Sequence, residues 1–170
     1  GSTLNLNSAT TTIGTSSSLT GGGTINLIGT QALNFASPYT ISATSTLLDP
    51  TGTITFGGPG PLTIAPGGSF KMTQDTANVD IDNQGNLNIE GGTSTINNSI
   101  NSTSFTNSGV LTIRGTSGAN VHLIVANGFT NAGTITLDNA HSAGRSQTLT
   151  VSSGTLTNTG TLSTTQTGAG

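Results

Sequence analysis

A nine-residue pattern that recurs at a nearly constant interval constrains this chain more than any other feature. The pattern is Φ-x-Asn-x-Gly-x-Φ-x-Φ, where Φ is an apolar residue, and Phe129–Leu137 is its clearest copy. The glycines of the four copies lie at positions 85, 109, 133 and 160, so successive copies are 24, 24 and 27 residues apart. A repeat of this length indicates a solenoid, in which each repeat packs only against its neighbours.

Each repeat in this region contains three short segments in which apolar or β-branched residues alternate with polar ones. Between the second and third glycines these segments are Val110–Ile113, Val121–Val125 and Phe129–Asn131. Between the third and fourth they are Thr134–Leu137, Gln147–Val151 and Leu156–Asn158, with an insertion at 139–146. Three strands and three turns per 24–27 residues predict an all-β fold, a right-handed parallel β-helix of roughly seven coils.

The regularity of the repeat divides the chain into three parts. Residues 1–78 alternate less regularly and hold Gly- and Pro-rich turns, so we expect irregular N-terminal β-helix coils there. Residues 79–164 contain the regular repeats, and residues 165–170 are expected to form a frayed tail. The initial Gly1-Ser2 resembles a cloning remnant, and we interpret the chain as a fragment that continues into the rest of a larger parent chain.

Stacking of the coils predicts a structural role for each position of the pattern. The apolar positions form inward columns, because side chains alternate between the two faces of a strand. The asparagines are expected to join their amides in a ladder at a turn; they are Asn83, Asn107, Asn131 and Asn158. The glycines are expected to adopt positive φ at the corner that follows; they are Gly85, Gly109, Gly133 and Gly160.

The composition excludes several classes of partner and cofactor. Charged residues make up 5% of the chain and the net charge is −3, so there is no basic footprint for nucleic acid and no polybasic patch for a membrane surface. No apolar run is long enough to cross a bilayer. There is no cysteine, which excludes disulfides and thiolate metal sites. We expect no cofactor.

The repeat unit Phe129–Leu137 and its copies across residues 79–164 resemble the repeats of large secreted bacterial adhesins. These are filamentous-haemagglutinin-like proteins of two-partner secretion and the related autotransporter passengers. The resemblance implies an extracellular, non-enzymatic segment on a bacterial cell surface. Such a segment acts as a stiff rod that projects or presents a binding surface. Its partner would be a glycan or protein on a host or neighbouring cell.

Asp80 and Asp82 are the acidic pair with the best spacing for chemistry. Both flank the inward Ile81 and are expected to project from the same outer face, roughly 7 Å apart. A carboxylate pair can serve a glycosidase as acid and base, or hold Ca²⁺ with backbone oxygens. A carbohydrate-active β-helix protein is therefore one alternative function. The chain has no Trp and one Tyr to form a sugar platform, which favours solvated surface acids.

Glu90, Arg114 and Asp138 each lie five residues after a motif glycine. Stacked coils would place them in one column, with Arg114 between the two acids and able to bridge both. This column is interpreted as a surface ionic ladder, which contributes about 0–1 kcal/mol per exposed pair. The functional alternative is a recognition spot for a charged sugar.

Outward threonines form the remaining candidate surface. The columns expected to carry them contain Thr106, Thr130, Thr157, Thr112, Thr134 and Thr136. Flat arrays of threonine on a solenoid resemble the water-ordering faces of many ice-binding proteins, so an ice-binding β-solenoid is the second alternative function. Asn and Val interrupt the array, and threonine also suits any exposed strand.

Overall fold

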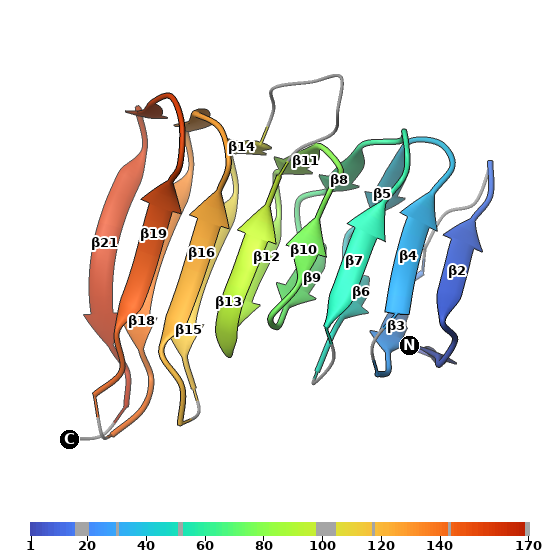
Figure 1. Ribbon diagram of the computed structural model, residues 1–170, viewed down its shortest axis with the longest axis horizontal. Helices are drawn as coiled ribbons and strands as arrows, with labels where there is room; N and C mark the ends of the chain where they lie inside the picture. Colours follow the sequence, from blue (N-terminus) through green and yellow to red (C-terminus); the bar gives the residue numbers. More distant parts are fainter. Residues whose placement is uncertain are drawn as a thin grey trace.

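The computed structural model is a right-handed parallel β-helix with three strands per coil and about six complete turns. It describes residues 1–15, 21–29, 31–50, 53–97, 105–116, 118–142 and 144–168. The strands lie side by side along the long axis, and the two termini lie at opposite ends (Figure 1). Among these residues no helix is long and apolar enough to cross a membrane.

The strands form three parallel sheets, which we call A, B and C. Sheet A contains β1 (Thr3–Leu6), β3 (Thr24–Leu27), β6 (Thr46–Leu48), β9 (Ser69–Met72), β12 (Asn86–Glu90), β15 (Val110–Gly115), β18 (Thr134–Asn139) and β21 (Thr161–Gln166). Sheet B contains β2 (Thr10–Ile13), β4 (Gln31–Phe35), β7 (Ile54–Gly57), β10 (Thr76–Ala77), β13 (Gly92–Ile96), β16 (Val121–Val125) and β19 (Gln147–Val151). Sheet C contains β5 (Tyr39–Ile41), β8 (Leu62–Ile64), β11 (Ile81–Asn83), β14 (Phe105–Asn107), β17 (Phe129–Asn131) and β20 (Leu156–Asn158).

Each complete coil passes through the sheets in the order A, B, C, and the first complete coil is β3–β4–β5. The turn count is about six rather than the predicted seven, because the described strands β1, β2 and β21 belong to incomplete coils at the two ends. The strand predictions in the regular part are confirmed. Strands β16, β17, β19 and β20 have the predicted bounds, while β15 and β18 each extend two residues further.

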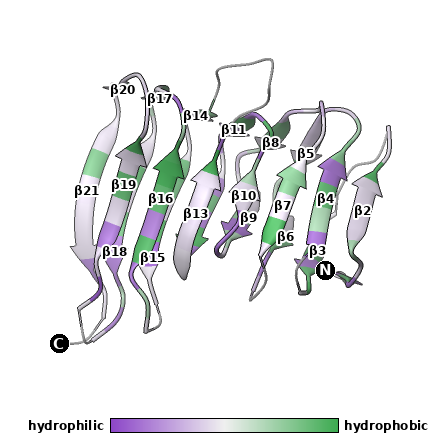
Figure 2. Ribbon diagram, in the orientation of Figure 1, coloured by the Kyte–Doolittle hydropathy of each residue, from purple (hydrophilic) through white to green (hydrophobic). Residues whose placement is uncertain are grey.

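The core consists of inward apolar columns that run along the axis. Buried residues alternate with partly exposed ones along strands such as β4 and β16, and both strands carry hydrophobic and hydrophilic segments (Figure 2). Phe105 and Phe129 lie in one column of sheet C, with ring centroids 4.7 Å apart, and Leu156 is paired with Phe129 in the next strand. In sheet A, Leu111 is paired with Ile135 and Ile135 with Leu162, which confirms the predicted register.

The motif asparagines lie at the turn from sheet C to sheet A, and their amides are joined in order. Nδ2 of Asn83 donates to Oδ1 of Asn107 at 2.6 Å, and the same 2.6 Å contact links Asn107 to Asn131 and Asn131 to Asn158. Asn107 also donates to the carbonyl of Thr134 at 3.1 Å. Asn83, Asn107 and Asn131 are buried, so each amide satisfies polar groups that water does not reach.

The ladder begins at Asn83 because the preceding coils carry an apolar residue at the same position. Asn83 is paired with Ile64, and Ile64 with Ile41. An isoleucine offers no donor, and Oδ1 of Asn83 has no hydrogen-bond donor among the described residues. The N-terminal coils therefore use a hydrophobic column where the regular coils use an amide ladder.

The motif glycines are required for a different reason from the one predicted. We predicted positive φ, but Gly85, Gly109, Gly133 and Gly160 are absent from the glycines with positive φ. Their role is steric instead: a Cβ on Gly133 would lie 2.1 Å from the carbonyl oxygen of Gly109, and one on Gly160 would lie 2.0 Å from that of Gly133. Stacked coils approach each other so closely at this corner that only hydrogen fits.

The predicted three-part division of the chain stays a prediction. Strand β21 ends at Gln166, inside the segment expected to fray. Residues 165–166 continue the pairing with β18, and Thr167 donates its backbone N–H to the carbonyl of Asn139. Residues 169–170 lie outside the described part of the chain.

Candidate functional site

The outer face of sheet A holds a row of charged side chains near one end of its strands. Glu90 is paired in register with Arg114, and Arg114 with Asp138. This is the column predicted from the spacing of five residues after each motif glycine. All three side chains project outward because Ile89, Ile113 and Leu137, which precede them, face the core.

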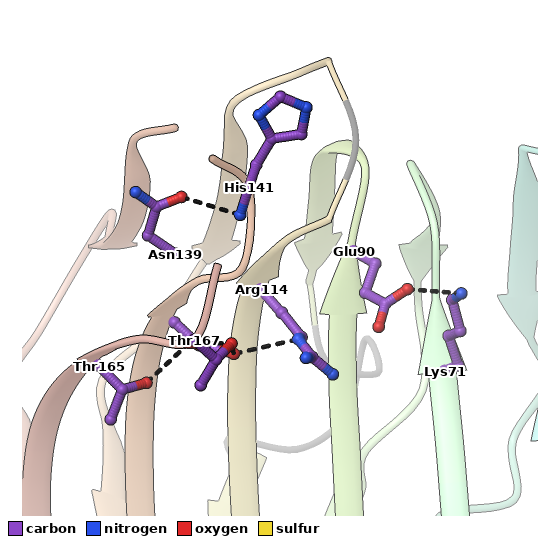
Figure 3. Close-up of polar contacts among 8 residues, drawn as sticks. Lys71, Glu90, Arg114, Asn139, His141, Thr165 and Thr167 are labelled. Atoms are coloured by element: carbon purple, nitrogen blue, oxygen red, sulfur yellow. Dashed lines mark hydrogen bonds and ion pairs between the residues drawn. The ribbon is translucent and has the colours of Figure 1, made fainter. Parts of the chain in front are cut away.

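The ion pairs differ from the predicted ladder, because Arg114 does not bridge both acids. Lys71 Nζ lies 2.6 Å from Glu90 Oε2, and Arg114 Nε lies 3.0 Å from Asp138 Oδ2 (Figure 3). Lys71 is opposite Asn88, so it reaches Glu90 diagonally across the strand pair. The Arg114 side chain is 43% exposed, so this pair contributes at most about 1 kcal/mol.

Asp138 is the best-anchored member of this row. It is buried, and its carboxylate accepts hydrogen bonds from the hydroxyls of Thr165 at 2.8 Å and Thr167 at 3.0 Å (Figure 3). Its contact with Arg114 is an ion pair without hydrogen-bond geometry. The guanidinium is therefore held at one edge and leaves its outer edge accessible to solvent. Such a group can bind a carboxylate or sulfate oxygen of a ligand.

Hydroxyl groups flank this row on the same face. Thr112 is paired with Thr136, and Thr136 with Ser163, which confirms the predicted register of this outer column. The hydroxyls of Thr136 and Ser163 are 3.0 Å apart. Val110 precedes Thr134 in the neighbouring column and is one of the exposed large hydrophobic residues. The patch formed by Arg114, Thr112 and Thr136 is called the sheet A patch below.

A second outer surface runs along the middle of sheet C. Register places one outward residue of each strand in a single column, and five of the six are threonine. The column is Thr40, Thr63, Asp82, Thr106, Thr130 and Thr157. The sequence predicted the last three threonines, while Thr40 and Thr63 were missed because the repeat is irregular before residue 79.

Asp82 interrupts that column and is held by its neighbours. The Thr106 hydroxyl donates to Asp82 Oδ1 at 2.7 Å, and Gln84 Nε2 donates to Asp82 Oδ2 at 2.6 Å. Both carboxylate oxygens therefore already accept a hydrogen bond from the protein. Within the part of the chain that the structure describes, no group of three His, Cys, Asp or Glu residues could hold a metal ion.

A hollow that the sequence did not predict lies at the C-terminal end of the core. A cavity of about 300 Å³ lies beside the last coils. Its lining is Ile135, Leu137, Leu149, Leu156, Leu162, Ser163 and Thr164. Five of the seven lining residues are apolar and none is titratable, so this cavity offers packing surface rather than chemistry.

Two buried carboxyl groups were also missed by the sequence analysis. Asp49 and Asp75 are almost completely inaccessible to solvent. Burial, followed by the hydrogen bond and the charge of neighbouring Asp49, raises the pKa of Asp75 to about 9. The available signal was their separation of 26 residues, close to one coil, which places both at the turn from sheet A to sheet B.

Comparison with known protein families gives a match over the C-terminal part of the chain. The family described as the hyphally regulated cell wall protein N-terminal domain matches residues 62–168, which include both candidate surfaces except for the first threonine of the sheet C column. No curated protein and no solved structure matches the chain.

Proposed function

The chain belongs to the family of hyphally regulated cell wall protein N-terminal domains, and from this premise we propose that it is a structural and adhesive domain of a cell-surface protein. The family is one of fungal cell-wall adhesins. It supports the cell-surface and adhesive parts of the resemblance noted in the sequence. It gives no support to a bacterial source, to two-partner secretion or to an autotransporter route.

The mechanism that we propose is mechanical. Every strand in the interior of the three sheets is paired on both sides, so the backbone groups of the rod are satisfied by the coils above and below. A solenoid of this kind keeps its outer side chains at the spacing of the strands, about 4.8 Å. It can therefore present a periodic surface to a periodic ligand.

The partner that we propose is a glycan on a host or neighbouring cell, bound by hydroxyl and guanidinium groups of the sheet A patch. Arg114 supplies an accessible cation, and Thr112 and Thr136 supply hydroxyls beside it. Each such contact is weak, and repetition along a polysaccharide raises the avidity. We propose no catalytic role for Asp80 and Asp82, because the Asp82 carboxylate is engaged by Gln84 and Thr106.

The test is binding of the chain to a panel of immobilised polysaccharides that contains neutral and acidic members. We expect retention on at least one polysaccharide, and loss of retention when Arg114→Ala is combined with Thr112→Val and Thr136→Val. The matched control is Thr106→Val with Thr130→Val on sheet C, which removes two hydroxyls from another face. No retention of the wild-type chain on the panel or on intact cells would contradict the proposal.

The sheet C column favours ice binding as a second candidate function. Five threonines in six strands form a file of hydroxyl and methyl groups at strand spacing. Thermal hysteresis of a concentrated solution is the direct measurement. If this candidate holds, hysteresis is present and falls when Thr130→Val and Thr157→Val are introduced. A solution that freezes without hysteresis removes it.

A further inference from the structure

Asp49 begins the turn from sheet A to sheet B in one coil, and Asp75 ends the same turn in the next coil. Asp49 follows β6, and Asp75 lies between β9 and β10 in the next coil. Backbone and side-chain contacts hold the two turns together: the Asp49 N–H donates to the carbonyl of Lys71 at 3.2 Å, and the Thr73 hydroxyl donates to the carbonyl of Asp49 at 2.9 Å. The pair therefore joins two successive coils.

The surroundings of Asp75 fix its orientation. Oδ1 accepts the N–H of Ile54 at 2.8 Å, and Oδ2 accepts the N–H of Thr73 at 2.7 Å. The carboxyl groups of Asp75 and Asp49 are also hydrogen-bonded to each other. A hydrogen bond between two carboxyl groups requires a proton on one of them, since two carboxylates offer only acceptors.

No cation within the described residues neutralises the pair. The strands packed around it are β6, β7, β9, β10 and β13, and Lys71 of β9 is their single charged residue. Its ammonium group lies on the outer face and is paired with Glu90. Two negative charges at this buried position would repel each other without a compensating cation, and each would lack the hydration that it has in the unfolded chain.

We propose that Asp49 and Asp75 share one proton in the folded protein, so that the coils they join are more stable at acidic than at alkaline pH. The pair links the coil that contains β6 and β7 to the coil that contains β9 and β10. In a solenoid each coil contacts only its neighbours, so loss of this link allows the two coils to separate locally. This inference does not depend on the adhesive function.

The direction of the pH effect follows from proton binding. The pKa of Asp75 is raised from about 3.8 to about 9, so between these values the folded chain holds a proton that the unfolded chain releases. The stabilisation is complete below the lower value and is lost as pH rises through the higher one. One proton corresponds to a rise of about tenfold in the unfolding equilibrium constant for each pH unit in this window.

Urea unfolding at several pH values from 5 to 8 tests the proposal, with Asp49→Asn as the informative variant. The new amide donates to the Asp75 carboxylate, which keeps the N–H donors of Ile54 and Thr73. We expect the Asp49→Asn chain to lose the tenfold-per-unit pH dependence that the wild-type chain shows. The matched control is Asp82→Asn on the outer face of sheet C, which is expected to keep the wild-type slope.

Carbon-13 NMR of the aspartate carboxyl groups gives a second measurement, and the spectrum of the wild-type chain needs no variant to fold. The wild-type chain is expected to show one protonated carboxyl resonance at pH 7, and Asp49→Asn and Asp75→Asn are each expected to remove it. Equal pH slopes in the wild-type and Asp49→Asn chains would overturn the proposal. A wild-type spectrum at pH 7 in which all five aspartates are ionised would overturn it equally.

Discussion

The close approach of the coils at the motif glycines leads to the sharpest prediction. In Gly133→Ala the new Cβ would lie 2.1 Å from the carbonyl oxygen of Gly109, whereas ordinary contact begins near 3.4 Å. The obstacle is backbone and not the flexible end of a side chain. The two coils must therefore separate locally by more than about 1 Å, since interiors of this density hold no spare volume.

The cost of this separation can be estimated from the hydrogen bonds that it breaks. Asn107 accepts backbone N–H groups from Ala132 at 2.8 Å and from Gly133 at 3.0 Å, and Gly109 accepts that of Thr134 at 2.9 Å. A displacement of about 1 Å takes all three beyond hydrogen-bond distance. At about 1 kcal/mol each, the substitution lowers the free energy of unfolding by about 3 kcal/mol.

Urea unfolding followed by far-ultraviolet circular dichroism measures this difference. Gly118→Ala is the matched control, because its Cβ would meet no atom closer than 3.9 Å and its φ is not positive. We expect this control to be neutral or stabilising by up to about 1 kcal/mol, since alanine restricts the unfolded chain. Both glycines lie in the same coil-forming region, so a general intolerance of alanine would affect both.

A second substitution separates the steric explanation from the conformational one. Asparagine tolerates positive φ better than alanine does. If Gly133 were needed for positive φ, Gly133→Asn would be milder than Gly133→Ala. The close approach to Gly109 predicts the opposite, because asparagine adds the same Cβ and more volume. A Gly133→Ala chain as stable as the wild type, or a milder Gly133→Asn, would refute the reasoning.

Three further substitutions test the ladder, the core and the charged row. Asn107→Ala removes three buried hydrogen bonds of the side chain, two that it donates and one that it accepts, and is expected to lower the free energy of unfolding by about 2–4 kcal/mol. The exposed Asn158→Ala is expected to lower it by less than about 1 kcal/mol. Equal losses of the two variants in urea unfolding would contradict the ladder. Phe105→Ala leaves a cavity against its neighbouring ring and is expected to cost about 3–5 kcal/mol by the same measurement. Arg114→Ala is expected to lower the free energy of unfolding by at most about 1 kcal/mol, because the Asp138 carboxylate keeps its two threonine hydroxyls. The difference in unfolding free energy between this variant and the wild type is expected to change little in about 0.5 M salt.

The repeat made most of the fold predictable. Strand positions and register follow from one period, because a shift of one residue would turn every apolar side chain outward. The stacking of Leu111 on Ile135 and of Thr112 on Thr136 could therefore be predicted from the sequence. The first two threonines of the sheet C column were not, because the N-terminal coils follow no constant spacing.

The candidate site was less predictable than the fold. Register placed Arg114 between Glu90 and Asp138, but it could not tell which partners the long side chains would choose. Glu90 forms its ion pair with Lys71, which lies diagonally across the strand pair. Such a choice depends on side-chain reach and on competing hydroxyl donors, which differ by fractions of a kcal/mol at an exposed surface.

The sequence by itself determined the coil, its three strands and the inward or outward direction of each side chain, because these depend on local alternation and on period. The tertiary structure alone decided how close the coils approach. That distance makes Gly133 a steric necessity, and it brings Asp49 of one coil against Asp75 of the next in a buried site that no cation of the described residues reaches. Contacts between coils depend on packing at the corners, where no periodic rule applies.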